Sequence, residues 1–237
     1  MTLAVVCFIW HDQARRRSYQ FEPEHVAILQ RMVARNLSRE HKFVYVAPDN
    51  LHLPNTEFVE LDTTKHVPGT CFVRLMARRP DFGELIGADR VLMLDLDVVI
   101  TGPLDPLVNR DEPSVFWRNP NYKEGGQRAF YQGSVQLFTP GAHSELWTEF
   151  DPEITPQWVN RRFGGAEQAW ISERLPWDLP HWTAVDGIYG AGRLGDGVPG
   201  VETVLPPNAR IVSFPGNRIP GQVETQAMHG WIKEFYY

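Results

Sequence analysis

The stretch from Arg90 to Ile100, RVLMLDLDVVI, constrains the fold more than any other part of this sequence. After Arg90 it is apolar at every position except two, Asp95 and Asp97. Such a run is typical of a strand that is buried on both faces of a parallel sheet. Because alternate side chains of a strand share a face, Asp95 and Asp97 are predicted to point the same way from within this strand, with attachment points about 6.5 to 7 Å apart.

Two ionised carboxylates on one face of an apolar strand repel each other and lose hydration, so they require compensation. A divalent cation supplies it, and oxygen-only ligands suit Mg²⁺ or Mn²⁺, which keep positions open for substrate phosphates. The turn-prone residues Thr101 to Pro103 follow, at a strand end where open α/β sheets bind ligands. The alternative is that both acids cap backbone groups as the strand leaves the sheet.

The remaining pattern predicts one α/β domain over residues 1–237, with a central, mostly parallel mixed sheet flanked by helices. A strand at Leu3–Trp10, a helix at Glu24–Leu37 and a strand at Lys42–Val46 would form a βαβ unit. The later elements are expected in this order: strand Glu57–Leu61, a helix that opens at Phe72–Met76, strands Ser114–Trp117 and Phe130–Phe138, helices His143–Phe150 and Glu167–Arg174, and strand Arg210–Phe214.

The charge and the cysteine content limit the binding partners and the cellular compartment that we expect. A formal net charge of −6 gives no overall attraction to duplex nucleic acid. The two cysteines, Cys7 and Cys71, are too few for a disulfide framework or a zinc site of the paired-cysteine kind, which fits a cytoplasmic location. The apolar run at the start is too short to span a bilayer, so no membrane span is expected.

Four segments occur in a characteristic order: Arg74-Leu75, the stretch VLMLDLDVVITGPLDPL, the strand Tyr131–Phe138, and Ala166–Ala169. In this order they resemble the arginine-leucine element, the aspartate-x-aspartate stretch, the asparagine-serine/glycine strand and the aspartate-glutamine helix start of one family. That family is the family 8 group of glycosyltransferases of the GT-A (Rossmann-like) fold, with its bacterial relatives. The segments RMVARNL and PPNARIVSF are similar to the bacterial relatives, so the resemblance spans nearly the whole chain.

The resemblance implies a metal-dependent glycosyltransferase that moves a sugar from a nucleotide-sugar donor to an acceptor hydroxyl with retention of configuration. Asp95 and Asp97 would bind Mn²⁺ or Mg²⁺ and the donor diphosphate, and a UDP-sugar is one candidate donor. Arg74 would reach the donor's phosphates or sugar, a role that suits the planar fork of arginine. A helix-face salt bridge is the alternative for Arg74. The acceptor stays open among glycan, lipid, protein, small molecule and modified nucleobase.

The resemblance also places the nucleotide base and the donor backbone contacts. Trp10, His11 and Asp12 end the first strand, where this fold receives the base, so Trp10 would stack and Asp12 would accept hydrogen bonds. The alternative is that these residues belong to the core or to a turn. Gly133 and Ser134 would let the substrate approach the backbone closely, although glycine in a strand also marks bulges.

Glu167 and Gln168 fall on the family's aspartate-glutamine pair, with glutamate in place of the aspartate. This position implies that they are the catalytic residues: the carboxylate would bind sugar hydroxyls or stabilise an oxocarbenium-like centre, and the amide would orient the acceptor. The alternative for Glu167 is an acid in the first turn of a helix.

The sequence departs from the family near the carboxyl end, where a histidine metal ligand is usual. Val212 to Gly216 contains no histidine, so the metal would have two protein ligands with water and phosphate, or His229 would replace the missing ligand. The alternative for His229 is an ordinary surface residue. Two other functions remain open: a nucleotide-sugar-binding protein without transfer, and a haloacid-dehalogenase-like phosphohydrolase, whose nucleophile motif also reads Asp-x-Asp.

Overall fold

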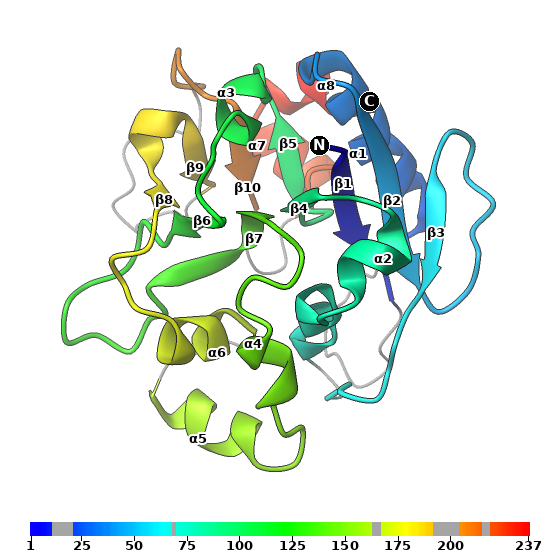
Figure 1. Cartoon of the computed structure of the whole chain (residues 1–237). Helices are drawn as coiled ribbons and strands as arrows, with labels where there is room; N and C mark the ends of the chain where they lie inside the picture. The colour runs from blue at the N-terminus through cyan, green and yellow to red at the C-terminus, as the bar shows by residue number, and fades with distance from the viewer. Residues whose placement is uncertain (11–20, 68–69, 163–166, 192–203, 215–218) are drawn as a thin grey trace.

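The fold is mixed α/β and is built around two sheets (Figure 1). The computed structural model describes residues 1–10, 21–67, 70–162, 167–191, 204–214 and 219–237. No helix within these ranges is long and apolar enough to cross a membrane. The prediction of a mostly parallel central sheet flanked by helices is confirmed.

The larger sheet has seven strands in the order β3-β2-β1-β4-β7-β6-β8. The strands β1 to β4 are parallel to one another, while β7 is antiparallel to both β4 and β6. A smaller sheet has the order β5-β10-β9. The strand bounds are β1 Leu3–Phe8, β2 His41–Ala47, β3 Glu57–Glu60, β4 Arg90–Leu94, β5 Val98–Ile100, β6 Ser114–Arg118, β7 Tyr131–Phe138, β8 His181–Trp182, β9 Ile188–Gly190 and β10 Ile211–Ser213.

Both faces of the larger sheet are covered, which explains why β1 is buried at every position. Alternate residues of β1, from Leu3 to Cys7, pack against α1 and the smaller sheet, whereas Ala4, Val6 and Phe8 pack against η1 and α2. The helical bounds are α1 Pro23–Asn36, η1 Phe72–Arg78, α2 Phe82–Ile86, α3 Asp105–Val108, α4 Glu145–Thr148, α5 Thr155–Arg162, α6 Glu167–Arg174, η2 Ala184–Asp186, α7 Val223–Met228 and α8 Ile232–Phe235.

The expected single strand over Arg90–Ile100 is wrong, because the chain divides it between the two sheets. The strand β4 ends at Leu94 in the larger sheet, and β5 begins at Val98 in the smaller one. Asp95, Leu96 and Asp97 form the turn between them. The aspartates therefore do not owe their placement to strand alternation, and the reason is long-range: β5 pairs with β10, more than a hundred residues later in the chain.

Most other predicted elements are present with shifted ends. The helix expected at Glu24–Leu37 is α1, the expected helix at Glu167–Arg174 is α6 with the same bounds, and the helix that opens at Phe72 is a 3₁₀ helix, η1. The helix expected at His143–Phe150 is shorter. The sequence reading did not include α3, α5, α7, α8, β8 or β9, which are all short or lie among proline and glycine residues.

Gly187 fixes the entry to the smaller sheet and offers a test of it. Its carbonyl accepts hydrogen bonds from the N–H groups of Arg210 and Ile211, at 2.8 and 3.2 Å. Its φ is 85°, the same value as at Gly141. A Cβ at Gly187 would collide with the carbonyl oxygen of Asn208, whereas a Cβ at Gly141 would meet nothing within 4 Å.

We therefore expect Gly187→Ala to lower the free energy of unfolding by about 3 kcal/mol and Gly141→Ala by about 1 kcal/mol, since both lose left-handed backbone freedom but only the first adds a clash. Thermal and denaturant unfolding of the two variants measures the difference. Equal losses would contradict the close approach of the two segments at Gly187.

Candidate functional site

The turn that carries Asp95 and Asp97 is held by both sheets. The N–H of Asp95 donates to the carbonyl of Ser134 in β7, at 3.0 Å, and the N–H of Phe214 donates to the carbonyl of Asp97, at 2.8 Å. The hydroxyl of Ser213 in β10 bonds to that of Ser134, at 3.2 Å. The two carboxylates therefore lie where the chain crosses from one sheet to the other, beyond the carboxyl end of β4.

Arg74 connects this turn to the start of α6. Its Nη1 forms an ion pair with Oδ1 of Asp95, and its Nη2 forms an ion pair with Oε2 of Glu167. The arginine side chain is 7% exposed and that of Glu167 is 2% exposed, so the pair is almost dry. Burial alone would lower the pKa of Arg74, but the negative charge of Glu167, the hydrogen bond that Arg74 donates to Glu167 and the charge of Asp97 raise it overall. Arg74 is therefore a fixed cation between the acids.

A second arginine continues the network into the core. Gln136 donates from Nε2 to Oε1 of Glu167, at 3.0 Å, and to the carbonyl of Gly133, also at 3.0 Å. Its Oε1 accepts a hydrogen bond from Nη2 of Arg78, which lies four residues after Arg74 in η1. Burial lowers the pKa of Arg78 to about 10, with Glu167 and Glu145 opposing the shift, so the side chain stays protonated at neutral pH.

Gly133 leaves the space that this network occupies. A Cβ at this position would collide with Nη2 of Arg74 and would lie 3.0 Å from Oε2 of Glu167. The strand is also irregular here, because the register between β6 and β7 shifts between Phe116 and Trp117. The sequence marked Gly133 as a place of close approach, and the group that approaches it in this structure is the Arg74–Glu167 ion pair.

The structure brings together Arg74, Asp95, Gly133, Ser134 and Glu167 from the set that the sequence predicted. Gln168 follows Glu167 in α6 and is partly exposed.

Trp10 follows β1 and packs, partly buried, against the core beside η1 and α2. His11 and Asp12 lie outside the described residues.

His229 is buried rather than on the surface, which corrects the alternative given for it. It is 1% exposed, and its ring meets those of Phe214 and Trp231 edge-on, with centroids 5.4 and 6.0 Å apart. Because Phe214 is bonded through its backbone to Asp97, His229 lies in the layer of side chains next to the turn. Among the residues that the structure describes, however, no three His, Cys, Asp or Glu side chains are grouped as metal ligands.

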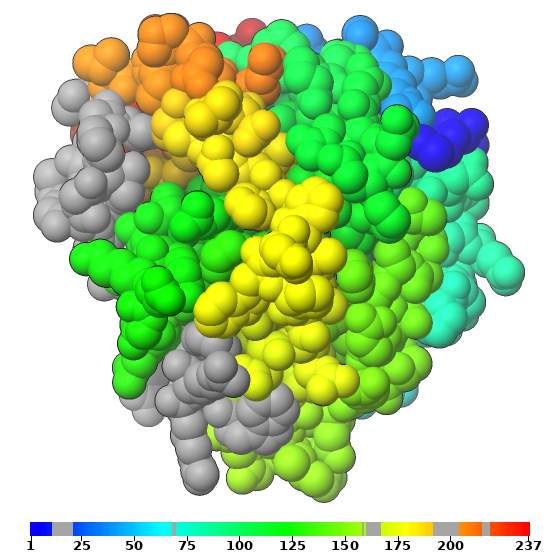
Figure 2. Space-filling view, turned by 60° about the vertical axis from the view of Figure 1, so that its left-hand side comes forward, coloured from blue at the N-terminus to red at the C-terminus, as the bar shows by residue number. Residues whose placement is uncertain are grey.

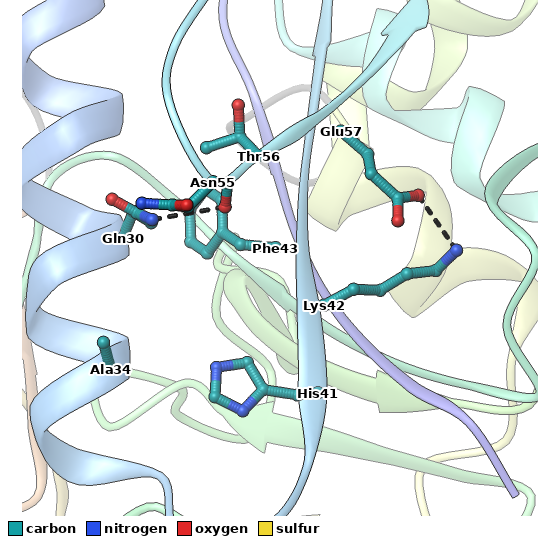
Figure 3. Close-up of a pocket in the computed structure, with 8 residues that line it drawn as sticks. All are labelled: Gln30, Ala34, His41, Lys42, Phe43, Asn55, Thr56 and Glu57. Carbon is teal, nitrogen blue, oxygen red and sulfur yellow. Dashed lines mark hydrogen bonds and ion pairs between the residues drawn. The ribbon is translucent and has the colours of Figure 1, made fainter.

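A pocket of about 320 Å³ lies between α1 and the start of β2 (Figure 3). In it Lys42 pairs with Glu57 at 2.9 Å, and Nε2 of Gln30 donates to the carbonyl of Asn55 at 3.2 Å. It opens beside His41, the first residue of β2, and so lies at the amino end of the parallel strands. Because ligands of open α/β sheets bind at the carboxyl ends, this pocket is not the candidate site.

Comparison with solved structures agrees with the fold described above. The chain is similar to the galactosyltransferase LgtC, solved with donor and acceptor sugar analogues, with a TM-score of 0.61 and 14% identity over 99% of this chain and 96% of that one. The chain has the GT-A fold. It is also similar to the glycosyltransferase GlyE of Streptococcus pneumoniae TIGR4, with a TM-score of 0.59 and 14% identity over 93% of this chain and 57% of that one. No protein-family model matches the sequence, and no curated protein matches it.

Sequence reasoning missed Gln136 and Arg78. A signal for Gln136 was present, because it is the one amide among the last four residues of the apolar strand Tyr131–Phe138 and is fully buried there. Arg78 lies four residues after Arg74, and its partner in β7 could not be read from that spacing.

The network predicts a large cost for removing its central amide. Gln136→Met keeps the approximate size but leaves Nη2 of Arg78 and Oε1 of Glu167 without their partner, so we expect it to lower the free energy of unfolding by about 3 kcal/mol. Gln132→Met is the matched control on the same strand, because Gln132 is only partly buried, and it should change stability by less than about 1 kcal/mol. Equal denaturant midpoints for the two variants would show that the network does not hold β7 to α6.

Proposed function

We propose that this chain is a glycosyltransferase that moves a sugar from a nucleotide-sugar donor to an acceptor hydroxyl with the help of Mn²⁺ or Mg²⁺. The observation that carries the proposal is the placement of Asp95 and Asp97 in one turn at the crossing between two sheets, with Arg74 fixed against the first of them. The GT-A fold supports it, because crevices beyond the carboxyl ends of parallel strands are where open α/β sheets bind ligands.

Asp95 and Asp97 would hold the metal. Arg74 occupies Oδ1 of Asp95, which leaves Oδ2 for a cation and fixes its direction. Carboxylate oxygens fit Mg²⁺ or Mn²⁺, whose other positions water and the donor phosphates would fill. When bound, the metal would neutralise charge on the departing nucleoside diphosphate. His229, next to Phe214, is the candidate third protein ligand.

Glu167 would act on the sugar by its charge rather than by a new hydrogen bond. Arg74 and Gln136 already engage its two oxygens, so the carboxylate would stabilise positive charge at the reacting carbon through space and would hold Arg74 in place. Gln168, the next residue and partly exposed, would contact the sugar or the acceptor with its amide.

The nucleotide would lie on the β1 side of the turn. Trp10 would stack with the base and His11 and Asp12 would bind the base or ribose, as the family resemblance implies, while Gly133 and Ser134 would border the sugar. The same resemblance implies transfer with retention, which anomeric NMR of the first product would test. A UDP-sugar is the first donor to try.

A thermal-shift panel of nucleotide-sugars, with and without Mn²⁺, should identify a donor that stabilises the chain only when the metal is present. With that donor, Asp97→Asn should weaken Mn²⁺ binding and lower donor hydrolysis and transfer by about a hundredfold, because it removes one charged metal ligand. Asp111→Asn, the same change at an exposed aspartate, is the control and should leave all three unchanged.

Three outcomes would contradict the proposal. If Asp97→Asn left both metal affinity and turnover at the wild-type level, the assigned metal site would be wrong. If the wild-type chain bound a nucleotide-sugar with Mn²⁺ but neither hydrolysed nor transferred it, the chain would be a binding protein. Hydrolysis of an aryl phosphate without any response to nucleotide-sugars would instead favour the phosphohydrolase alternative.

A further inference from the structure

A larger pocket, of about 1120 Å³, lies on the other side of the larger sheet's centre from β1. The described residues that line it come from the end of β6, from the segment 119–128 that follows, from Thr183 and Ala184, from β9, and from Pro206. Figure 2 shows this side of the molecule, with the green segment after β6 below the yellow and orange segments. None of the described residues of the proposed metal or donor set lines this pocket.

The pocket is connected to the carboxylate turn through paired strands. Trp117, which lines it, is in register with Gln132, the neighbour of Gly133. Gly190, on the opposite wall, is in register with Ser213, whose hydroxyl bonds to Ser134 beside Asp95. A molecule in the pocket therefore lies across β7 from the position proposed for the nucleotide, which is where an acceptor would need to approach the donor sugar.

The charge of the pocket is opposite to that of the chain. Among the residues that the structure describes, Arg118, Lys123 and Arg128 line it and no Asp or Glu does, although Glu124 follows Lys123 in the chain and the formal net charge of the whole chain is −6. All three cations are exposed, and among the described residues none of them forms an ion pair. Three cations, with no acidic side chain in the described lining, favour an anionic ligand over a neutral one.

Hydrogen bonds and a ring contact close the wall that carries these cations. Asn119, 4% exposed, donates from Nδ2 to the carbonyl of Ala129 at 2.8 Å, and its own N–H donates to the carbonyl of Phe130 at the same distance. The Tyr122 ring packs edge-on against Phe130, with centroids 5.0 Å apart. A backbone closed in this way is formed before a ligand binds, which lowers the ordering cost of binding.

Aromatic side chains give the pocket a second kind of surface. Trp117, Tyr122 and Tyr189 line it, and the Tyr189 hydroxyl is fixed by Asn208 at 2.7 Å. Aromatic rings present an apolar face with a polar edge, which suits the mixed faces of a sugar ring. The combination of rings and cations matches a sugar that carries an acidic group.

We propose that this pocket, which we call the basic pocket, is the acceptor site and that it takes an anionic sugar, one that bears a phosphate or a carboxylate. The inference rests on the proposed transferase function and adds the class of the acceptor. Lys123 and Arg128 bind the acidic group, and the aromatic side chains of the basic pocket contact the ring.

Calorimetric titration of the full chain with glucose 6-phosphate, glucuronate, glucose and inorganic phosphate tests the proposal, with and without Mn²⁺ and UDP. One or both anionic sugars should bind at least about tenfold more tightly than glucose and than inorganic phosphate, and their affinity should fall with added salt. The preferred probe distinguishes a phosphate-bearing acceptor from a carboxylate-bearing one.

The double variant Lys123→Glu/Arg128→Glu should weaken binding of the preferred probe by about tenfold or more, as expected for two reversed contacts. Arg31→Glu, a reversed cation on the exposed side of α1, is the control and should stay within about twofold of wild type. Thermal unfolding checks that each variant is folded, and because the reversed residues are exposed, their midpoints should match that of the wild type.

Equal affinity for glucose and its anionic forms, or an unchanged affinity in the double variant, would overturn the inference. Inorganic phosphate bound as tightly as the sugars would also overturn it, because the ring would then contribute nothing. Metal-dependent binding of a nucleotide-sugar is measured separately. If no nucleotide-sugar bound, the transferase proposal would be contradicted; if nucleotide-sugars bound but the anionic sugars did not, only the proposed acceptor class would be contradicted.

Discussion

The ion pairs of Arg74 with Asp95 and Glu167 are the interaction on which the candidate site depends. They join three parts of the chain that are far apart in sequence: the 3₁₀ helix η1, the turn after β4, and the first residue of α6. Two carboxylates and a guanidinium that were buried apart would each lose hydration without compensation, so their meeting is what makes their burial tolerable. An arginine can serve both acids at once because its two terminal nitrogens point in different directions.

Arg74 is paired with a turn that lies at the crossing between the two sheets. The chain leaves the larger sheet at Leu94 and enters the smaller one at Val98, so Asp95, Leu96 and Asp97 belong to neither sheet and form the turn that joins them. Backbone hydrogen bonds hold the turn from both sides: the N–H of Asp95 donates to Ser134, and the N–H of Phe214 donates to Asp97. In such an arrangement the site is rigid without being part of a sheet, a property that suits the precise placement of charged ligands.

The sequence predicted the central sheet and the candidate residues better than it predicted how they are arranged. The apolar run at β1 and the helical stripe of α1 fold as expected, because burial on both faces and helical periodicity are local patterns. The division of Arg90–Ile100 was missed, since nothing in that run shows that its second half pairs with β10. The roles of Arg78 and Gln136 were missed for the same reason: each is defined by a partner distant in the chain.

The central expectation is that the Asp95–Asp97 turn binds a diphosphate through a metal. The most direct test measures the affinity of the wild-type chain for nucleoside diphosphates, UDP first, in the presence of Mn²⁺ and in the presence of EDTA. We expect at least one diphosphate to bind at least about tenfold more tightly with Mn²⁺ than without it, because the phosphate oxygens would fill the positions of the metal that the protein leaves open. Diphosphate affinities that are the same in Mn²⁺ and in EDTA, or no binding in either, would contradict it.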